Sequence, residues 1–279
     1  MSVNKDASGR RYVQVEFEVP GTPEEVWDAI ATGPGISSWF VPTVVEERDG
    51  KPVAMKYIFG PGIEPSAEVT AWHPPLTFTA QGEVYGGGAP PVATEWTIEA
   101  RSGGVCLVRM VHSLFASTDE WDNQIEGAEM GWSGFLRTLK LYLKHFRGQR
   151  AAIMQLTTPV AGSEAETWEI LTSAMGVSGA KLGQRWATPA GVSALGGIVE
   201  EFTAEPYDAL MRLDAPWPGI AALGAVTYPN GPTVAAMNLY IYGDKAAEIV
   251  AEQTPVWQAF LQEHFPLPAE QSAGDPQKA

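Results

Sequence analysis

DEWDNQIEGAEMGWSGFLRTLKLYLKHF, from Asp119 to Phe146, is the stretch that decides the fold. It contains no proline, and its apolar residues recur every three or four positions, which places them on one side of a helix. The apolar stripe consists of Trp121, Ile125, Ala128, Trp132, Phe135, Leu139, Leu143 and Phe146. A helix of about 28 residues is roughly 42 Å long at 1.5 Å per residue, so its apolar side needs a broad sheet to cover it.

The residues before this helix read as that sheet. Tyr12 to Val19 alternates apolar and polar residues, as a half-buried strand does, and Thr22 and Pro23 then start a short helix. A second short helix is predicted at Ile36 to Phe40. Further strands are predicted at Thr43 to Glu47, Val53 to Phe59, Ala67 to Trp72, Thr77 to Gln81, Thr94 to Ala100 and Val105 to Phe115. Short turns separate them, so we expect an antiparallel meander that curls around the long helix in an α+β fold.

The pattern then starts again. Val13 to Ile30 matches Met154 to Leu171 at a constant offset of 141 residues, including a capping residue, a first-turn glutamate and a tryptophan. The segment WQAFL at Trp257 echoes WSGFL at Trp132 at an offset of 125, so the second copy is shorter by about one hairpin. We predict a first domain at 1–148, a shortened repeat at 149–266 and a disordered tail at 267–279.

Composition narrows the class of protein. The formal net charge is −15, which repels phosphate backbones and disfavours nucleic-acid binding. The uncharged runs are too short and too rich in glycine for membrane insertion, and the N-terminus lacks an apolar signal core. The single cysteine, Cys106, lies in an apolar run and suggests a buried thiol in the cytoplasm.

The alternation of residues along the predicted strands indicates which side chains face the long helix. The even positions of Val105 to Phe115 and of Thr94 to Ala100 are aromatic or apolar, with His112 as a polar exception. This layer either fills the core or leaves an apolar pocket with a few polar groups. His112 is either a ligand-orienting or proton-carrying residue, or a core residue bonded to a neighbour. Metal-binding spacings and phosphate-binding loops are absent from the sequence, so no metal and no cofactor are predicted.

Four segments together resemble the SRPBCC superfamily: EVPGTPEEVWDAIATGPGISSWFVP, VTAWHPP, TEWTIEARSGGVCLVRMVHSLF and GWSGFLRTLKLYLKHF. The nearest branch is the bacterial family named after the activator of the heat-shock-chaperone ATPase. The resemblance covers Arg11 to about Phe146, whereas the second half resembles the superfamily only at its two ends. It implies a helix-grip fold with a cavity between the sheet and the C-terminal helix. Relatives include lipid and hormone carriers, polyketide aromatases or cyclases, and chaperone activators, so the fold leaves function open.

Three hypotheses follow. The first is a cytoplasmic binding protein for a small hydrophobic molecule in the first domain. Its expected ligand-binding residues are Trp39, Phe40, Trp72, Trp96, Met110, His112, Trp132 and Phe135. The second is a protein-interaction module with a chaperone as its partner. The third is an enzyme of the cyclase kind, in which His112 and a nearby glutamate act as acid and base. For the second repeat we expect either a lid or half of a pseudo-dimer, and a homodimer partner also remains open.

Overall fold

The computed structural model describes residues 4–6, 10–60, 62–82, 91–115, 122–227 and 231–266, with only the backbone at 115, 122–131 and 133. The chain divides into two compact units, Met1–Ala151 (unit 1) and Ala152–Ala279 (unit 2). The tail expected at 267–279 lies outside the described residues.

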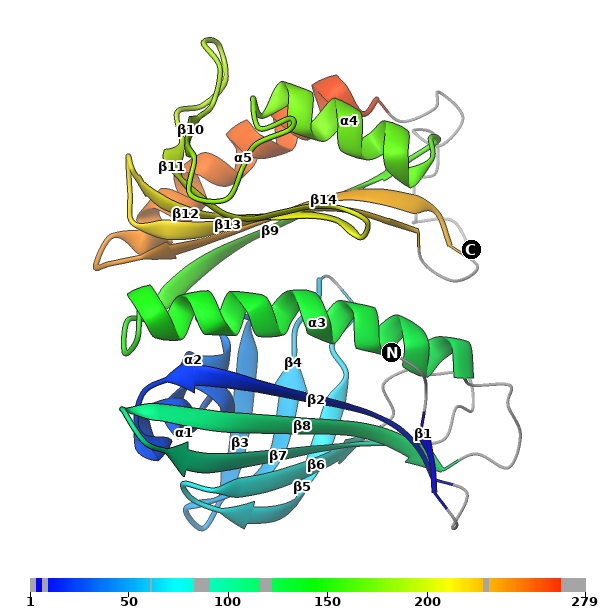
Figure 1. Cartoon of the computed structure of the whole chain (residues 1–279), viewed down its shortest axis with the longest axis vertical. Coiled ribbons are helices and arrows are strands. Elements are labelled where there is room, and N and C mark those ends of the chain that lie inside the picture. The colour runs from blue at the N-terminus through cyan, green and yellow to red at the C-terminus, as the bar shows by residue number, and fades with distance from the viewer. Residues whose placement is uncertain are drawn as a thin grey trace. The chain divides into compact units, whose positions relative to one another are not determined.

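Eight strands in the described part of unit 1 form one antiparallel sheet in the order β1-β2-β8-β7-β6-β5-β4-β3 (Figure 1). Their bounds are β1 Asn4–Lys5, β2 Arg10–Pro20, β3 Thr43–Arg48, β4 Lys51–Tyr57, β5 Ser66–His73, β6 Thr77–Gly82, β7 Val92–Arg101 and β8 Val105–Phe115. Strands β3 to β8 are neighbours in chain order, so they form the predicted meander, and β2 pairs with β8 along its whole length. The predicted α+β fold class is confirmed.

The long helix α3, Asp122–His145, lies along this sheet and packs most closely against β2 (Figure 1). Leu139, Leu143 and Phe146 from the predicted apolar stripe are all buried. Residues 119–121, where the helix was expected to begin, lie outside the described residues. Unit 1 therefore has the helix-grip arrangement, in which a long helix covers one face of an antiparallel sheet.

Two short helices precede the meander. Helix α1, Pro23–Ala31, begins with a capping box: Glu25 N–H donates to Thr22 Oγ1, and Thr22 N–H donates to the Glu25 carboxylate. Helix α2 spans Gly33–Ile36, so the prediction of a helix at Ile36 to Phe40 was wrong. The reason is a second cap, because Thr32 Oγ1 accepts from Gly35 N–H at 3.0 Å and starts the helix earlier than its apolar residues suggest.

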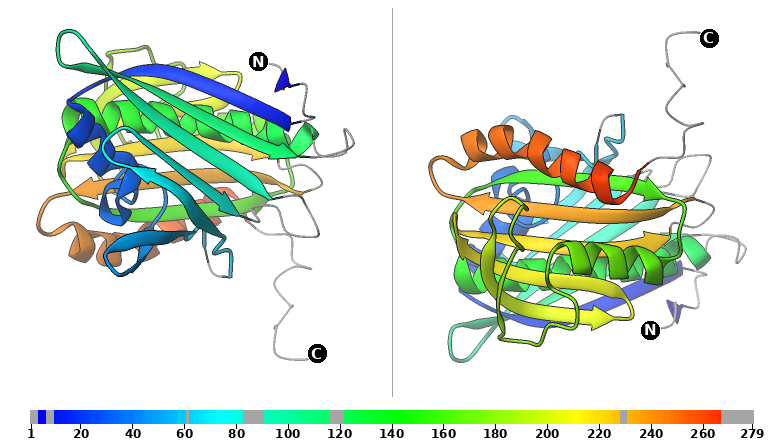
Figure 2. Two further views of the ribbon diagram at one scale, coloured as in Figure 1. Left: turned by 90° about the horizontal axis from the view of Figure 1, so that it is seen from below. Right: turned by 90° about the horizontal axis from the view of Figure 1, so that it is seen from above.

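In the described part of unit 2, six antiparallel strands follow the order β10-β11-β12-β13-β14-β9. Their bounds are β9 Ala151–Val160, β10 Arg185–Ala187, β11 Gly196–Ala204, β12 Tyr207–Ala215, β13 Gly219–Thr227 and β14 Thr233–Tyr242. Helices α4 (Glu164–Ala174) and α5 (Ala246–His264) cover one face of this sheet (Figure 2). The core between them is apolar and includes the fully buried Trp257.

The two units repeat the same local structures. Ser163 and Glu166 form a capping box at α4, as Thr22 and Glu25 do at α1. A further repeated feature escaped the sequence analysis: Trp39 donates its indole N–H to Ala29 O, and Trp186 donates to Met175 O, both at 2.8 Å. Leaving β1 aside, the described sheets contain seven strands and six strands, so the shorter copy lacks one strand rather than a hairpin.

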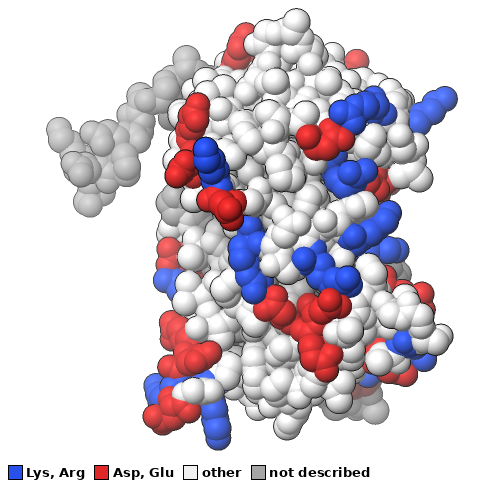
Figure 3. Space-filling model, turned by 90° about the vertical axis from the view of Figure 1, so that its left-hand side faces the viewer, with Lys and Arg blue, Asp and Glu red and all other residues white. Residues whose placement is uncertain are grey.

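The surface carries mixed charge despite the net charge of −15. On the face drawn in Figure 3, acidic and basic side chains lie side by side. Ion pairs such as Arg147 with Glu25 and Arg185 with Asp214 neutralise charge locally. Among the described helices, none combines the length and the apolar character that a bilayer crossing requires.

Candidate ligand-binding site

Strand register determines which side chains lie on the face of the unit 1 sheet that is turned towards α3. Phe78, Trp96 and Met110 are opposite one another across β6, β7 and β8, and all three are buried. Side chains at opposite positions of neighbouring strands point to the same side of a sheet. The Phe78 and Trp96 rings are nearly parallel, with centroids 6.2 Å apart. These three side chains form the sheet side of an apolar layer between the sheet and α3, which is called the inner layer below.

Phe40, in the turn between α2 and β3, packs against the aromatic side chains of α3. Its ring is stacked on Trp132 at 5.2 Å and meets Phe135 edge to face at 4.4 Å. Trp132 in turn lies edge to face with Trp96 at 5.8 Å. Phe40 is buried, whereas Trp132 and Phe135 are half-buried. These contacts order the aromatic rings that line the layer.

His112 is a buried polar residue on the inner face of β8. It is opposite Thr94 in the register of β8 and β7, and its Nδ1 lies 2.9 Å from Thr94 Oγ1. The imidazole is 4% exposed, and burial lowers the pKa of His112 to about 4. The ring is therefore neutral at neutral pH, and its centroid is 6.0 Å from that of Trp132.

Seven of the eight expected ligand-binding residues lie in this one layer, namely Trp39, Phe40, Trp96, Met110, His112, Trp132 and Phe135. Trp72 lies at its margin, where it contacts Phe78 and the Trp27 ring of α1. The structure thus brings the predicted residues together, while ligand binding by them remains a prediction.

Two further residues of the layer were missed by the sequence analysis. Tyr57 is on the same face of β4 as the buried Met55, with its ring 6.0 Å from Phe40. Arg11 is opposite the buried Leu114 and is itself only 2% exposed. The predicted first strand began at Tyr12, one residue too late to include Arg11. Extending the alternation of Val13 and Val15 by one step would have placed it on the inner face.

Glu95 cannot be the glutamate that was proposed as a catalytic partner of His112. Glu95 is on the outer face of the sheet, where it forms an ion pair with Arg10. Glu68 is exposed, and Glu83 lies outside the described residues. No group of three or more potential metal-binding side chains occurs among the residues that the structure describes.

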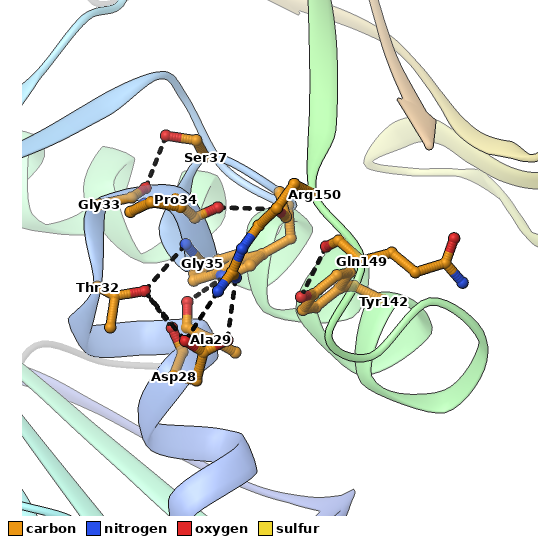
Figure 4. A network of polar contacts seen from close by, with 12 residues as sticks. Asp28, Ala29, Thr32, Gly33, Pro34, Gly35, Ser37, Tyr142, Gln149 and Arg150 are labelled. Atoms are coloured by element: carbon orange, nitrogen blue, oxygen red, sulfur yellow. Dashed lines mark hydrogen bonds and ion pairs between the residues drawn. The ribbon is translucent and has the colours of Figure 1, made fainter. Parts of the chain in front are cut away.

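A polar network links α1 and α2 to the segment that follows α3 (Figure 4). The Arg150 guanidinium donates two hydrogen bonds to the Asp28 carboxylate, at 2.9 and 3.0 Å. Near it, Tyr142 donates to Gln149 O at 3.1 Å. The Trp39 bond to Ala29 O belongs to the same network and fixes the residue that precedes Phe40. The segment that follows α3 therefore helps to position the aromatic residues.

The interior of unit 2 has a different composition. The inward positions of β14 are Ala235, Met237, Leu239 and Ile241, all fully buried and all apolar. Trp257, the counterpart of Trp132 in the repeat, has no exposed surface. In the described part of unit 2, hollows of about 160 and 450 Å³ lie at the margins of this core, one at the start of α4 and the end of α5, the other at the β10 edge. Polar residues that line them already bind protein groups: Glu166 caps α4, and Arg185 pairs with Asp214.

Comparison with known proteins supplies structural similarities only. No protein-family model matches the chain, and no curated protein matches it. Similar solved structures include CalU16 from Micromonospora echinospora, with 18% identity over 52% of this chain and 83% of that chain and a TM-score of 0.40. The di-domain ARO/CYC BexL from the BE-7585A biosynthetic pathway is 14% identical over 92% of this chain and 99% of its own, with a TM-score of 0.45. The Aha1 dimer from Colwellia psychrerythraea is 21% identical over 49% of this chain and 98% of that chain, with a TM-score of 0.39.

The strand order of unit 1 and its long helix confirm that the chain has the helix-grip fold, as the resemblance implies. The similarities themselves are too low to transfer a function, so function is argued from the site.

Proposed function

We propose that unit 1 binds a small, mainly apolar molecule between the inner face of its sheet and α3. The single observation that carries this proposal is a hydrogen-bonding pair, Thr94 and His112, on the inner face of the sheet beside the Trp132 ring. Ligand sites in proteins are mostly apolar and contain a few positioned polar groups that orient the ligand.

Partial exposure of the aromatic side chains supports the proposal. Burial raises the pKa of Tyr57 far above its ordinary value, so its hydroxyl is surrounded by protein, yet the residue keeps accessible surface. Trp132 and Phe135 on α3 are half-buried as well. A closely packed core leaves little such surface, as the fully buried Met237 and Leu239 of unit 2 illustrate. Accessible aromatic surface beside desolvated polar groups is what a small apolar guest would cover.

The neutral state of His112 fits binding better than acid–base catalysis. A general acid or base is most effective when its pKa lies near the working pH, and burial instead lowers that of His112 to about 4. A neutral imidazole and a hydroxyl are well suited to orienting a carbonyl or hydroxyl group of a ligand.

Binding of N-phenyl-1-naphthylamine, an uncharged probe that fluoresces in apolar sites, tests the proposal. We expect saturable binding, and we expect Trp132→Leu to weaken it about tenfold, since lost apolar contact in a pocket costs about 1–3 kcal/mol. Trp217→Leu is the matched control, because Trp217 packs against the core of unit 2. Absence of saturable binding, or equal weakening by the two variants, would contradict the proposal.

A further inference from the structure

The hydroxyl of Tyr57 is a buried hydrogen-bond donor whose partner is a weak acceptor. Tyr57 lies on the same face of β4 as Met55, which is fully buried. Among the residues that the structure describes, the hydroxyl donates to the Met55 thioether, with Oη 3.3 Å from Sδ. A thioether sulfur accepts weakly, so this bond offsets little of the free energy that the hydroxyl loses on leaving water. The Tyr142 hydroxyl, by contrast, donates to a strong acceptor, the backbone carbonyl of Gln149.

Aromatic rings connect the surroundings of Tyr57 with the surface. The Tyr57 ring lies edge to face with Phe40, with centroids 6.0 Å apart, and Phe40 is stacked on Trp132. Phe59, just after β4, is 39% exposed, and its ring centroid lies 5.7 Å from that of Phe40. A molecule that enters the inner layer beside Phe59 therefore meets aromatic rings first and the Tyr57 hydroxyl next.

The chemistry of this hydroxyl suits an uncharged acceptor. Burial raises the pKa of Tyr57 far above its ordinary value, so the group keeps its proton and remains a donor at neutral pH. A carbonyl oxygen is a much stronger acceptor than a thioether, and rotation about the C–O bond is enough to exchange one for the other. The net charge of −15 repels anions at long range, which favours a neutral carbonyl over an acidic group.

We infer that Tyr57 selects ring-containing ligands that carry an uncharged carbonyl group, by donating its hydroxyl to the carbonyl oxygen. This inference rests on the proposed function of unit 1 and specifies its ligand class. The rings of the ligand pack against Phe40 and Trp132, and its carbonyl oxygen replaces the Met55 sulfur as the acceptor. Tyr57 is thus a specificity-determining residue of the site.

A matched pair of compounds, 9-fluorenone and fluorene, tests this assignment, because they share one rigid ring system and differ by the carbonyl oxygen. We expect the full-length protein to bind fluorenone about threefold more tightly than fluorene in equilibrium dialysis, since a hydrogen bond in the site more than replaces the lost hydration of the carbonyl. Tyr57→Phe removes only the hydroxyl, and we expect it to weaken fluorenone binding about tenfold while the Kd of fluorene changes less than about twofold.

The carbonyl stretching frequency of bound fluorenone provides a second readout. A hydrogen bond to the oxygen lowers this frequency, so we expect a lower value in the wild-type complex than in cyclohexane, and a return towards the cyclohexane value in Tyr57→Phe. In the ligand-free protein, Tyr57→Phe is expected to leave the Tm unchanged or to raise it, because it removes a hydroxyl whose partner is weak. A marked fall in Tm would instead assign the hydroxyl a structural role and overturn the inference.

Two controls keep the outcomes distinct. Tyr207→Phe removes a hydroxyl from a tyrosine that packs against the core of unit 2, and it is expected to leave both Kd values unchanged. Trp132→Leu is expected to weaken both compounds, which locates them in the inner layer. If the wild-type protein prefers fluorene, or if Tyr57→Phe changes neither the preference nor the carbonyl frequency, the inference is overturned while the proposed function stands. Binding of neither compound overturns both.

Discussion

Acidification is expected to destabilise unit 1 through His112. Burial lowers the pKa of this imidazole from an ordinary value of about 6.5 to about 4 in the folded protein. Above pH 6.5 both the folded and the unfolded chain carry a neutral ring, so His112 adds no pH dependence. Between pH 6.5 and 4 the unfolded chain binds a proton that the folded chain does not, and stability therefore falls as the pH falls.

The size of the effect follows from the pKa difference. Each pKa unit corresponds to about 1.4 kcal/mol, so the interval from 6.5 to 4 is worth roughly 3 kcal/mol. Most of this stabilisation is lost by pH 4.5. The loss is a large fraction of the free energy of unfolding of an ordinary domain. His112→Gln keeps a group that can hydrogen-bond to Thr94 but cannot bind a proton, so it is expected to lack this loss.

Urea unfolding followed peptide by peptide with hydrogen exchange separates the two units and provides the measurement. The quantity to compare is the change in unfolding free energy of β8 and α3 between pH 7 and pH 4.5 in the wild type and in His112→Gln. His73→Gln, at an exposed histidine of β5, controls for removal of a histidine as such. If His112→Gln loses as much stability on acidification as the wild type, the account of His112 as a buried neutral group is refuted.

Two further substitutions test the packing around the site. Gly35→Ala is expected to cost about 3 kcal/mol or more, because a Cβ there would lie 1.8 Å from Asp28 O. Among the described atoms, a Cβ at Gly134 in α3 meets none closer than 3.7 Å, so Gly134→Ala is expected to gain about 0.5–1 kcal/mol. Calorimetric unfolding measures both, and equal effects of the two changes would refute the close approach of α2 to α1. Trp39→Phe removes the indole donor of Ala29 O and is expected to lower the stability of unit 1 by about 2 kcal/mol. Trp186→Phe is expected to act likewise on unit 2, and a neutral result for either variant would show that its bond is dispensable.

Local patterns in the sequence were sufficient to predict most of the elements. The three-to-four spacing of Leu139, Leu143 and Phe146 predicted α3, and alternation predicted β8 with its observed bounds, because burial on one face imposes a period that the sequence records. The capping residues Thr22 and Ser163 revealed the repeat, since a helix start depends on few residues close in sequence. Helix α2 was misplaced because the cap at Thr32 outweighs the apolar residues that follow it.

The sequence by itself determined the long helix and the inner face of the strands, because both depend on periodicities within single segments. Only the tertiary structure decided that Thr94 meets His112, that Phe40 meets α3, and that Arg11 is buried while Arg10 is paired outside. Those contacts join residues far apart along the chain, and they depend on which strands pair and in which register. Register is set by the whole sheet, so no single stretch of sequence specifies it.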